Sequence, residues 1–193
     1  MKHLTPAAAL IALLTLSGCG RRAAPMLTGA VTADDAVYVY LSVDPSARGT
    51  LIAHGAGAST PVAVTPTRLT PGQGYFLHMV AINGTGRAGV LGEFRLNGPR
   101  LHFADGSQRL LTGLPGWSAG YGGAAPDLAP QPWTSPAGGL FPEGANGAPP
   151  WGLTKGIAPA AQWIWPADAR SFPAGPPNAC TRCSADFSAV ILP

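Results

Sequence analysis

The sequence predicts an all-β protein, an antiparallel jelly-roll-like β-sandwich with long loops rich in glycine and proline. Short runs of β-branched and aromatic residues recur along the chain, and turn signals separate them. No segment beyond the N-terminus keeps the apolar spacing of a helix. Glycine and proline number 26 and 21 of 193 residues, which suits a domain with many tight turns. We therefore expect a single sandwich domain at 27–193, long enough to bury a core.

The first half of this domain reads as a series of strands. In the most regular of them one face carries Val37, Val39, Leu41 and Val43, and the other carries Tyr38, Tyr40 and Ser42. Turn signals such as P-G-Q-G, N-G and D-G divide the series. The strands predicted in this half are 27–32, 37–43, 50–54, 62–65, 75–82, 89–96, 101–104 and 109–112.

The second half begins with a long loop region at 113–150, which holds several aromatic residues among many glycines and prolines. A loop of this length is usually functional or wraps the core, and disorder of parts of it is the alternative. Two further strands are predicted, at 161–165 and 186–192. Trp163 and Trp165 lie two positions apart, and we expect both on one strand face in the core.

The N-terminus has the order of an export signal. Lys2 and His3 precede an uncharged apolar run at 7–16, which is too short to span a bilayer as a stable helix. We therefore expect a signal helix at 1–18 that is removed on export. The alternative for the cysteine that follows is a chance occurrence after an ordinary secretory signal.

The stretch L-S-G-C at 16–19 resembles the signal box of bacterial lipoproteins. The resemblance implies cleavage before Cys19, acyl chains such as palmitate on the processed cysteine, and a lipidated tether at 19–26. Gly20 resembles the residue found in lipoproteins that go to the outer membrane of organisms that have one. Arg21 and Arg22 could lie against anionic headgroups. The expected place of the protein is the bacterial cell envelope.

Cys180 and Cys183 are the cysteines left over once Cys19 carries a lipid. In an oxidising compartment we expect them to form a short-loop disulfide. Redox chemistry or zinc binding are the alternatives for a C-x-x-C pair. A thioredoxin-like redox site needs its cysteine pair at a helix N-terminus after a strand, whereas a proline-rich segment precedes this pair. A zinc site needs two further soft ligands, and the nearby sequence has none.

Charge gives no case for nucleic acid as a partner. Removal of Lys2 with the signal leaves 11 of the 12 basic residues against 9 acidic ones, and the arginines are scattered. A protein that binds a phosphate backbone needs a dense cationic face.

Three pieces of the chain resemble the galactose-binding-like β-sandwich modules of extracellular proteins. They are V-T-A-D-D-A-V-Y-V-Y at 31–40, W-G at 151–152 with G-I-A-P-A-A-Q-W-I-W at 156–165, and the C-terminal strand. The resemblance covers most of 27–193 and implies a jelly roll with a broad habit of binding carbohydrate or other surface ligands. Family members usually turn through Asn-Gly after the Tyr-x-Tyr strand, whereas this chain reads L-S-V-D-P-S-A-R-G at 41–49. No binding residue is carried over from that turn.

Catalysis is not expected. Glu93 and Glu143 have no visible carboxylate partner, and glycoside hydrolysis needs two carboxylates at a defined separation. A G-x-S-x-G nucleophile signature is missing, and His54, His78 and His102 lack the spacing of metal ligands. Convergence of such groups in space would reopen the question.

Asp34 and Asp35 are weak candidates for a calcium site, since calcium prefers oxygen ligands. A turn that enters the following strand is the favoured alternative, and no other metal or cofactor is expected.

Trp117, Trp133 and Tyr121 are the candidate ligand-binding residues, because a flat aromatic ring can stack on the apolar face of a sugar. Anchoring of the loop region is the equal alternative for the two tryptophans.

The sequence thus predicts a lipid-anchored, exported, non-catalytic module that recognises carbohydrate or another cell-envelope ligand. The alternative is a structural or assembly lipoprotein that contacts a partner protein in the envelope.

Overall fold

The computed structural model describes residues 24–125, 127–167 and 180–193. The predictions for 1–18, for Cys19 and for most of the tether fall outside these residues. The described chain is all-β. A search of the described residues finds no helix that is long and apolar enough to cross a membrane. Its strands are β1 (Met26–Asp34), β2 (Ala36–Ser42), β3 (Thr50–Ala56), β4 (Val62–Arg68), β5 (Tyr75–Asn83), β6 (Gly89–Asn97), β7 (His102–Phe103), β8 (Arg109–Leu111), β9 (Trp117–Ala124), β10 (Leu140–Ala145), β11 (Gln162–Pro166) and β12 (Cys183–Leu192).

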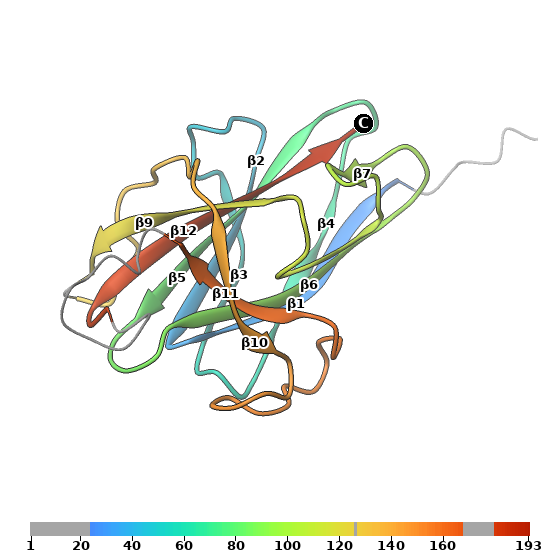
Figure 1. Ribbon diagram of the computed structural model, residues 1–193. Coiled ribbons are helices and arrows are strands. Elements are labelled where there is room, and N and C mark those ends of the chain that lie inside the picture. The colour runs from blue at the N-terminus through green and yellow to red at the C-terminus, as the bar shows by residue number, and fades with distance from the viewer. Residues whose placement is uncertain (1–23, 126, 168–179) are drawn as a thin grey trace, which may run out of the picture.

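The strands form two antiparallel sheets that pack as a sandwich (Figure 1). Sheet A has the order β10-β11-β6-β1-β4, and β8 also pairs with β6. Sheet B has the order β3-β2-β5-β12-β7, and β9 also pairs with β12. The red β12 lies between the green β5 and the yellow β9 in Figure 1 and pairs with β5 from Cys183 to Ile191. The C-terminal strand is therefore an inner strand of its sheet.

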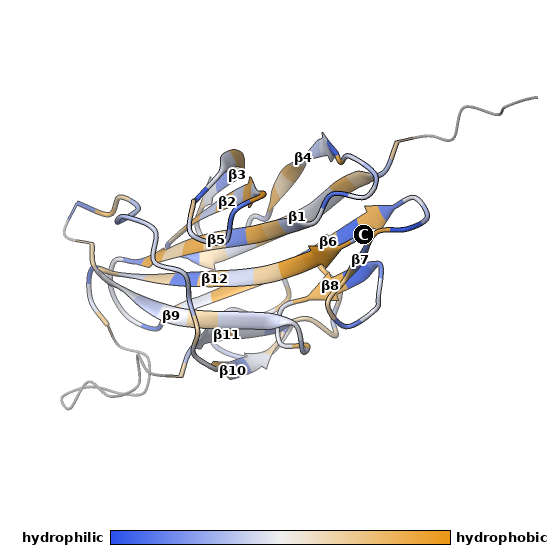
Figure 2. Ribbon diagram, turned by 90° about the horizontal axis from the view of Figure 1, so that it is seen from above, coloured by the Kyte–Doolittle hydropathy of each residue, from blue (hydrophilic) through white to orange (hydrophobic). Residues whose placement is uncertain are grey.

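The main core lies between the sheets and takes one face of each strand. Val37, Val39 and Leu41 point into it, which confirms the predicted alternation as far as Leu41. Val43 was expected on the same face, but it lies beyond the end of β2 and is exposed. Phe94 of sheet A and Phe187 of sheet B are fully buried in the same cluster. Figure 2 shows apolar residues along β6 and the C-terminal half of β12, with hydrophilic residues at the connecting turns.

A second apolar cluster lies on the outside of sheet A, beneath the connection 146–161. It contains Leu91, Leu111, Ile157 and Trp163. Trp163 stacks on Trp151 with 4.3 Å between the ring centroids.

Trp163 and Trp165 are both fully buried, so the prediction that they are core residues is confirmed. The prediction that both lie on one face of the strand is wrong. Trp165 packs at the edge of Phe187 in the main core, whereas Trp163 belongs to the outer cluster. The register against β10 shifts between Pro142 and Gly144, so β10 carries an extra residue opposite this part of β11.

The expectation of a long loop throughout 113–150 also needs correction. β9 and β10 lie inside this region and extend the two sheets. β9 contains Gly120, Gly122 and Gly123, and β10 contains Pro142, which are residues that strands usually avoid. Pairing with β12 and β11 overrides this weak local preference.

Cys180 and Cys183 form the expected disulfide just before β12. Cys183 pairs with Asn83 at the start of the β5–β12 ladder, and the amide of Asn83 donates a hydrogen bond to the carbonyl of Cys180. The disulfide therefore joins a loop to the inner strand that follows it.

Candidate functional site

The outer face of sheet B, which is turned away from the main core, carries buried polar side chains beside aromatic rings. Strand alternation that sends Val39 and Phe187 inward sends their neighbours outward. We call this surface the outer face, and its members on β2, β3, β5 and β12 are Tyr38, Tyr40, His54, Phe76, His78, Ser184, Asp186 and Ser188.

Several polar residues of the outer face are buried. His78 is inaccessible to solvent, and Asp186 and Ser188 are almost so. The Nδ1 atom of His78 lies 3.1 Å from the hydroxyl oxygen of Ser188, within hydrogen-bond distance across the β5–β12 pair. Buried ionisable groups are costly in a fold, so a reason for their presence is required.

A cover segment, 127–138, explains the burial. Its end pairs with β9 through two backbone hydrogen bonds between Ala119 and Gly138. The backbone N–H of Thr134 donates to Asp186 over 3.4 Å. The indole of Trp133 lies against His78, with 4.1 Å between the ring centroids. The segment thus crosses the outer face and shields its polar row from water.

The β2–β3 turn holds the cover segment from the other side. The indole N–H of Trp133 donates to the carbonyl of Pro45 over 3.0 Å. The guanidinium of Arg48 donates to the carbonyl of Gln131 and lies over the ring of Tyr40, 5.3 Å from its centroid. Arg48 therefore connects the turn, the cover segment and the outer face.

Burial shifts both titratable groups of the covered row toward their neutral forms. Desolvation raises the pKa of Asp186 to about 7, although the N–H of Thr134 and the charge of Arg48 oppose the shift. Desolvation lowers the pKa of His78 to about 4, against the effect of the carbonyls of Asp44 and Ala47. Shifted groups of this kind gather at functional sites.

Two buried nitrogens of the same region have no hydrogen-bond partner within the described residues. They are Nε2 of His78 and Nε of Arg48. Buried polar atoms in native proteins are normally satisfied by protein or water. Both side chains nevertheless lie beside polar protein groups, since the carbonyls of Asp44 and Ala47 act on His78 and the hydroxyl of Tyr40 interacts with Arg48.

The accessible part of the outer face is aromatic. Tyr38 and His54 stack with 4.1 Å between centroids and an angle of 16° between their planes. His54 is exposed, and Tyr38, Phe76 and Trp133 are partly exposed. Flat rings beside polar groups make a surface that suits ligands with both apolar faces and hydroxyl groups.

The three predicted ligand-binding residues are not brought together. Trp117 lies on β9, is only 8% exposed, packs on Phe94 and donates from its indole to the carbonyl of Leu111. It is a core residue because its strand face points inward. Tyr121 is 36% exposed and sits opposite the core residue Ala185, so it lies on the inward face at the strand's end. Trp133 is therefore the one of the three on the outer face.

The residues behind the family resemblance meet elsewhere, at the far end of the sandwich from the start of β1. The indole N–H of Trp151 donates to Asp34 over 2.8 Å, and its ring stacks on Trp163. The carboxylate of Asp35 accepts the N–H of Gly84 over 2.7 Å. Desolvation raises the pKa of Asp34, with the indole hydrogen bond acting against it. These contacts give the motif a structural role.

Calcium binding by Asp34 and Asp35 stays a prediction. Within the described ranges, no group of three or more His, Cys, Asp or Glu residues is placed to hold a metal ion. One oxygen of each aspartate already accepts a hydrogen bond from Trp151 or Gly84.

Glu93 and Glu143 both lie on strands of sheet A and are held by arginines. Glu93 forms ion pairs with Arg95 and Arg109 and also accepts the N–H of Ala158 over 2.9 Å. Glu143 forms an ion pair with Arg87 over 3.3 Å. Sequence reasoning missed the pairs Glu93–Arg109 and Glu143–Arg87 because their members come from separate elements, whereas Arg95 lies two positions from Glu93 on β6.

Sequence reasoning also missed Asp186, Arg48 and Tyr40 as site residues. Asp186 had a usable signal, since a carboxylate between apolar residues of a predicted strand must face either water or a polar partner. Nothing local links it to the cover segment, 52 residues away at Thr134.

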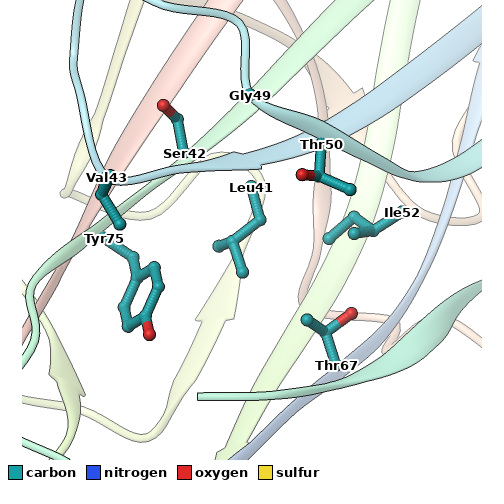
Figure 3. Close-up of a pocket in the computed structure, with 8 residues that line it drawn as sticks. All are labelled: Leu41, Ser42, Val43, Gly49, Thr50, Ile52, Thr67 and Tyr75. Carbon is teal, nitrogen blue, oxygen red and sulfur yellow. The ribbon is translucent and has the colours of Figure 1, made fainter. Parts of the chain in front are cut away.

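A hollow lies at the end of the sandwich where β1 starts. It measures about 330 Å³ and is lined by the ends of β2, β3, β4 and β5. Figure 3 shows Leu41, Ile52 and Tyr75 around it, with Val43 at its edge. The lining is mainly apolar, and we call this hollow the end notch.

The fold defines the chain as an all-β sandwich of two antiparallel sheets with a strap-like segment across one outer face. Compared with protein-family models, with curated proteins and with solved structures, the chain gives no match. Function is therefore argued from the site itself.

Proposed function

We propose that this protein is an exported, lipid-anchored binding module that recognises carbohydrate through the outer face of sheet B. The observation that carries the proposal is the combination, on one sheet face, of partly exposed aromatic rings with buried polar groups. Trp133, Tyr38 and His54 supply the rings. Arg48, His78 and Asp186 supply the polar groups beside them.

The chemistry of a sugar ring fits such a surface. Its C–H face packs on a flat aromatic ring through dispersion, and its hydroxyl groups both donate and accept hydrogen bonds. The guanidinium of Arg48 has several N–H donors, and the imidazole of His78 can donate or accept according to its tautomer. A site of this kind favours a ligand that is apolar on one side and polar at its rim.

The proposed role is non-catalytic because the carboxylates are not arranged for acid–base chemistry. Glu93 and Glu143 are engaged by arginines on sheet A, away from the outer face. Asp186 lies on sheet B, so it does not share a sheet with Glu93 and Glu143. Glycoside hydrolysis needs two carboxylates at a defined separation.

The N-terminal resemblance to lipoproteins supports the proposed place of the protein. An export signal followed by Cys19 leads to a domain held at the cell-envelope membrane by its lipid. Glycans and envelope proteins are the partners available there. Assembly with an envelope protein is the alternative that a negative glycan screen would favour.

A glycan array with the wild-type domain and the Trp133→Ala variant tests the proposal. We expect the wild type to bind a defined set of glycans, and the variant to lose roughly tenfold in affinity because a stacking ring is removed. Leu153→Ala is the matched control, since Leu153 is an exposed residue at the far end of the molecule. A wild type that binds no glycan, or a Trp133→Ala variant that binds as well, contradicts the proposal.

A further inference from the structure

The chain enters the domain at a fixed point. The carbonyl of Pro25 accepts the N–H of Leu69 over 2.8 Å, and the N–H of Met26 donates to Asn97 over 2.9 Å. Pro25 is thereby held between the β4–β5 turn and the end of β6. Figure 1 shows that the start of β1, the β4–β5 turn and the end of β12 lie at the same end of the sandwich. We call it the tether end.

The tether end lies close to Cys19 along the chain. Five residue steps separate Cys19 from Ala24, the first described residue. A fully extended chain spans at most about 18 Å over that distance. A lipid on Cys19 therefore holds the start of the described chain, at the tether end, within about that distance of the bilayer surface.

Apolar side chains are exposed at this end. Val43 is 61% exposed, Leu51 is 50% exposed and Leu192 is 39% exposed. The end notch opens beside Val43, and Thr67 in its lining pairs with Leu27 at the start of β1. The notch and the entry point of the chain are thus separated by a single strand, β4.

We propose that the tether end is a membrane-docking surface that rests on the bilayer holding the lipid of Cys19. The inference rests on the lipid anchor of the proposed function and is independent of carbohydrate binding. Val43 and the mouth of the end notch contact the interface between headgroups and acyl chains. The outer face of sheet B then stands away from the membrane plane and stays open to ligands.

Two observations favour a bilayer as the occupant. The short tether makes docking an intramolecular event, so weak contacts suffice. Arg68 and Arg100 are exposed at this end, and within the described residues neither forms an ion pair. Such cations are attracted to anionic headgroups, as a second signal beside a lipid.

The carboxylates at the tether end are engaged in their own turns. Asp44 accepts hydrogen bonds from the N–H and the hydroxyl of Ser46. Asp105 accepts the N–H of Ser107. Their charges weaken the attraction of the arginines, so the apolar side chains carry a substantial share of the contact.

A fluorescence measurement on the processed, lipidated full chain tests the inference. Val43→Cys and Leu153→Cys, each labelled with an environment-sensitive fluorophore, are reconstituted into vesicles of phosphatidylethanolamine and phosphatidylglycerol. Leu153 is the matched control because it is also 61% exposed but lies on the connection 146–161, which touches the opposite end of β3. Lipids carrying a spin label serve as quenchers.

We expect a blue shift and loss of most fluorescence at position 43, and little change at position 153. A protein that sediments with vesicles while position 43 stays unquenched overturns the inference and leaves the anchor intact. Equal quenching at both positions means no preferred orientation and overturns it as well. A chain that does not sediment shows that the anchor itself fails, and the docking surface falls with it.

Discussion

At the scale of the residue, the surroundings of Asp186 on the outer face change the pKa of its carboxyl group. It lies on an inner strand, is 3% exposed, and receives one long hydrogen bond from Thr134. Removal of water raises its pKa to about 7, so the folded protein holds a proton that the unfolded chain releases at much lower pH.

This residue predicts a pH-dependent stability difference. Between about pH 4 and pH 7 the unfolded state loses the proton of Asp186 while the folded state keeps it, so the free energy of unfolding falls as the pH rises. The Asp186→Asn variant lacks this effect. We expect its stability relative to the wild type to increase by about 2.5 kcal/mol between pH 5 and pH 8. Urea unfolding at the two pH values measures it.

The nearby histidine does not obscure this comparison. The pKa of His78 is lowered to about 4, so its stabilising contribution is lost as the pH falls from its ordinary value of 6.5 toward 4. That loss occurs in both proteins and cancels in the difference. Identical pH profiles for wild type and Asp186→Asn would show that the carboxyl is ionised in the folded state.

At the scale of elements, local sequence predicted ten of the twelve strands. β2 and β5 were clear because β-branched, aromatic and other apolar residues fill them between strong turn signals. β9 was hidden by its glycines, and its pairing with β12 joins residues more than 50 positions apart. The cover segment could not be predicted for the same reason, because its contacts join residues far apart in the sequence. Trp133 was predicted as a candidate from its aromatic ring alone, whereas Asp186, Arg48 and Tyr40 were not predicted.

The attachment of the cover segment to β9 can be tested with two adjacent glycines. A Cβ atom on Gly138 would lie 2.7 Å from the carbonyl oxygen of Ala119, whereas on Gly139 it would meet nothing within 4 Å. We expect Gly138→Ala to destabilise the protein by about 1–3 kcal/mol and to expose Trp133. Gly139→Ala should change little. Thermal unfolding and tryptophan emission report both effects, and equal behaviour of the variants would refute the role given to this bridge.

At the scale of the molecule, the two ends of the sandwich differ in the contacts they make. The far end is closed by Asp34, Trp151 and Trp163, which are the motif residues that resembled extracellular sandwich modules. The contacts of that motif are structural, and the proposed recognition surface is the outer face between the ends. The tether end faces the membrane in the arrangement proposed above.

The proposed lipid anchor makes a prediction about the whole protein in cells. Cys19→Ser removes the acyl acceptor, so we expect no incorporation of labelled palmitate and release of the protein from the membrane fraction. The melting temperature of the isolated variant should equal that of the unlipidated domain, because within the described residues the contacts that hold the chain entry start at Pro25. Cys180→Ser with Cys183→Ser is the control, since these cysteines form the disulfide and should leave labelling intact. Palmitate retained by Cys19→Ser would mean that another residue carries the lipid or that the lipoprotein assignment is wrong.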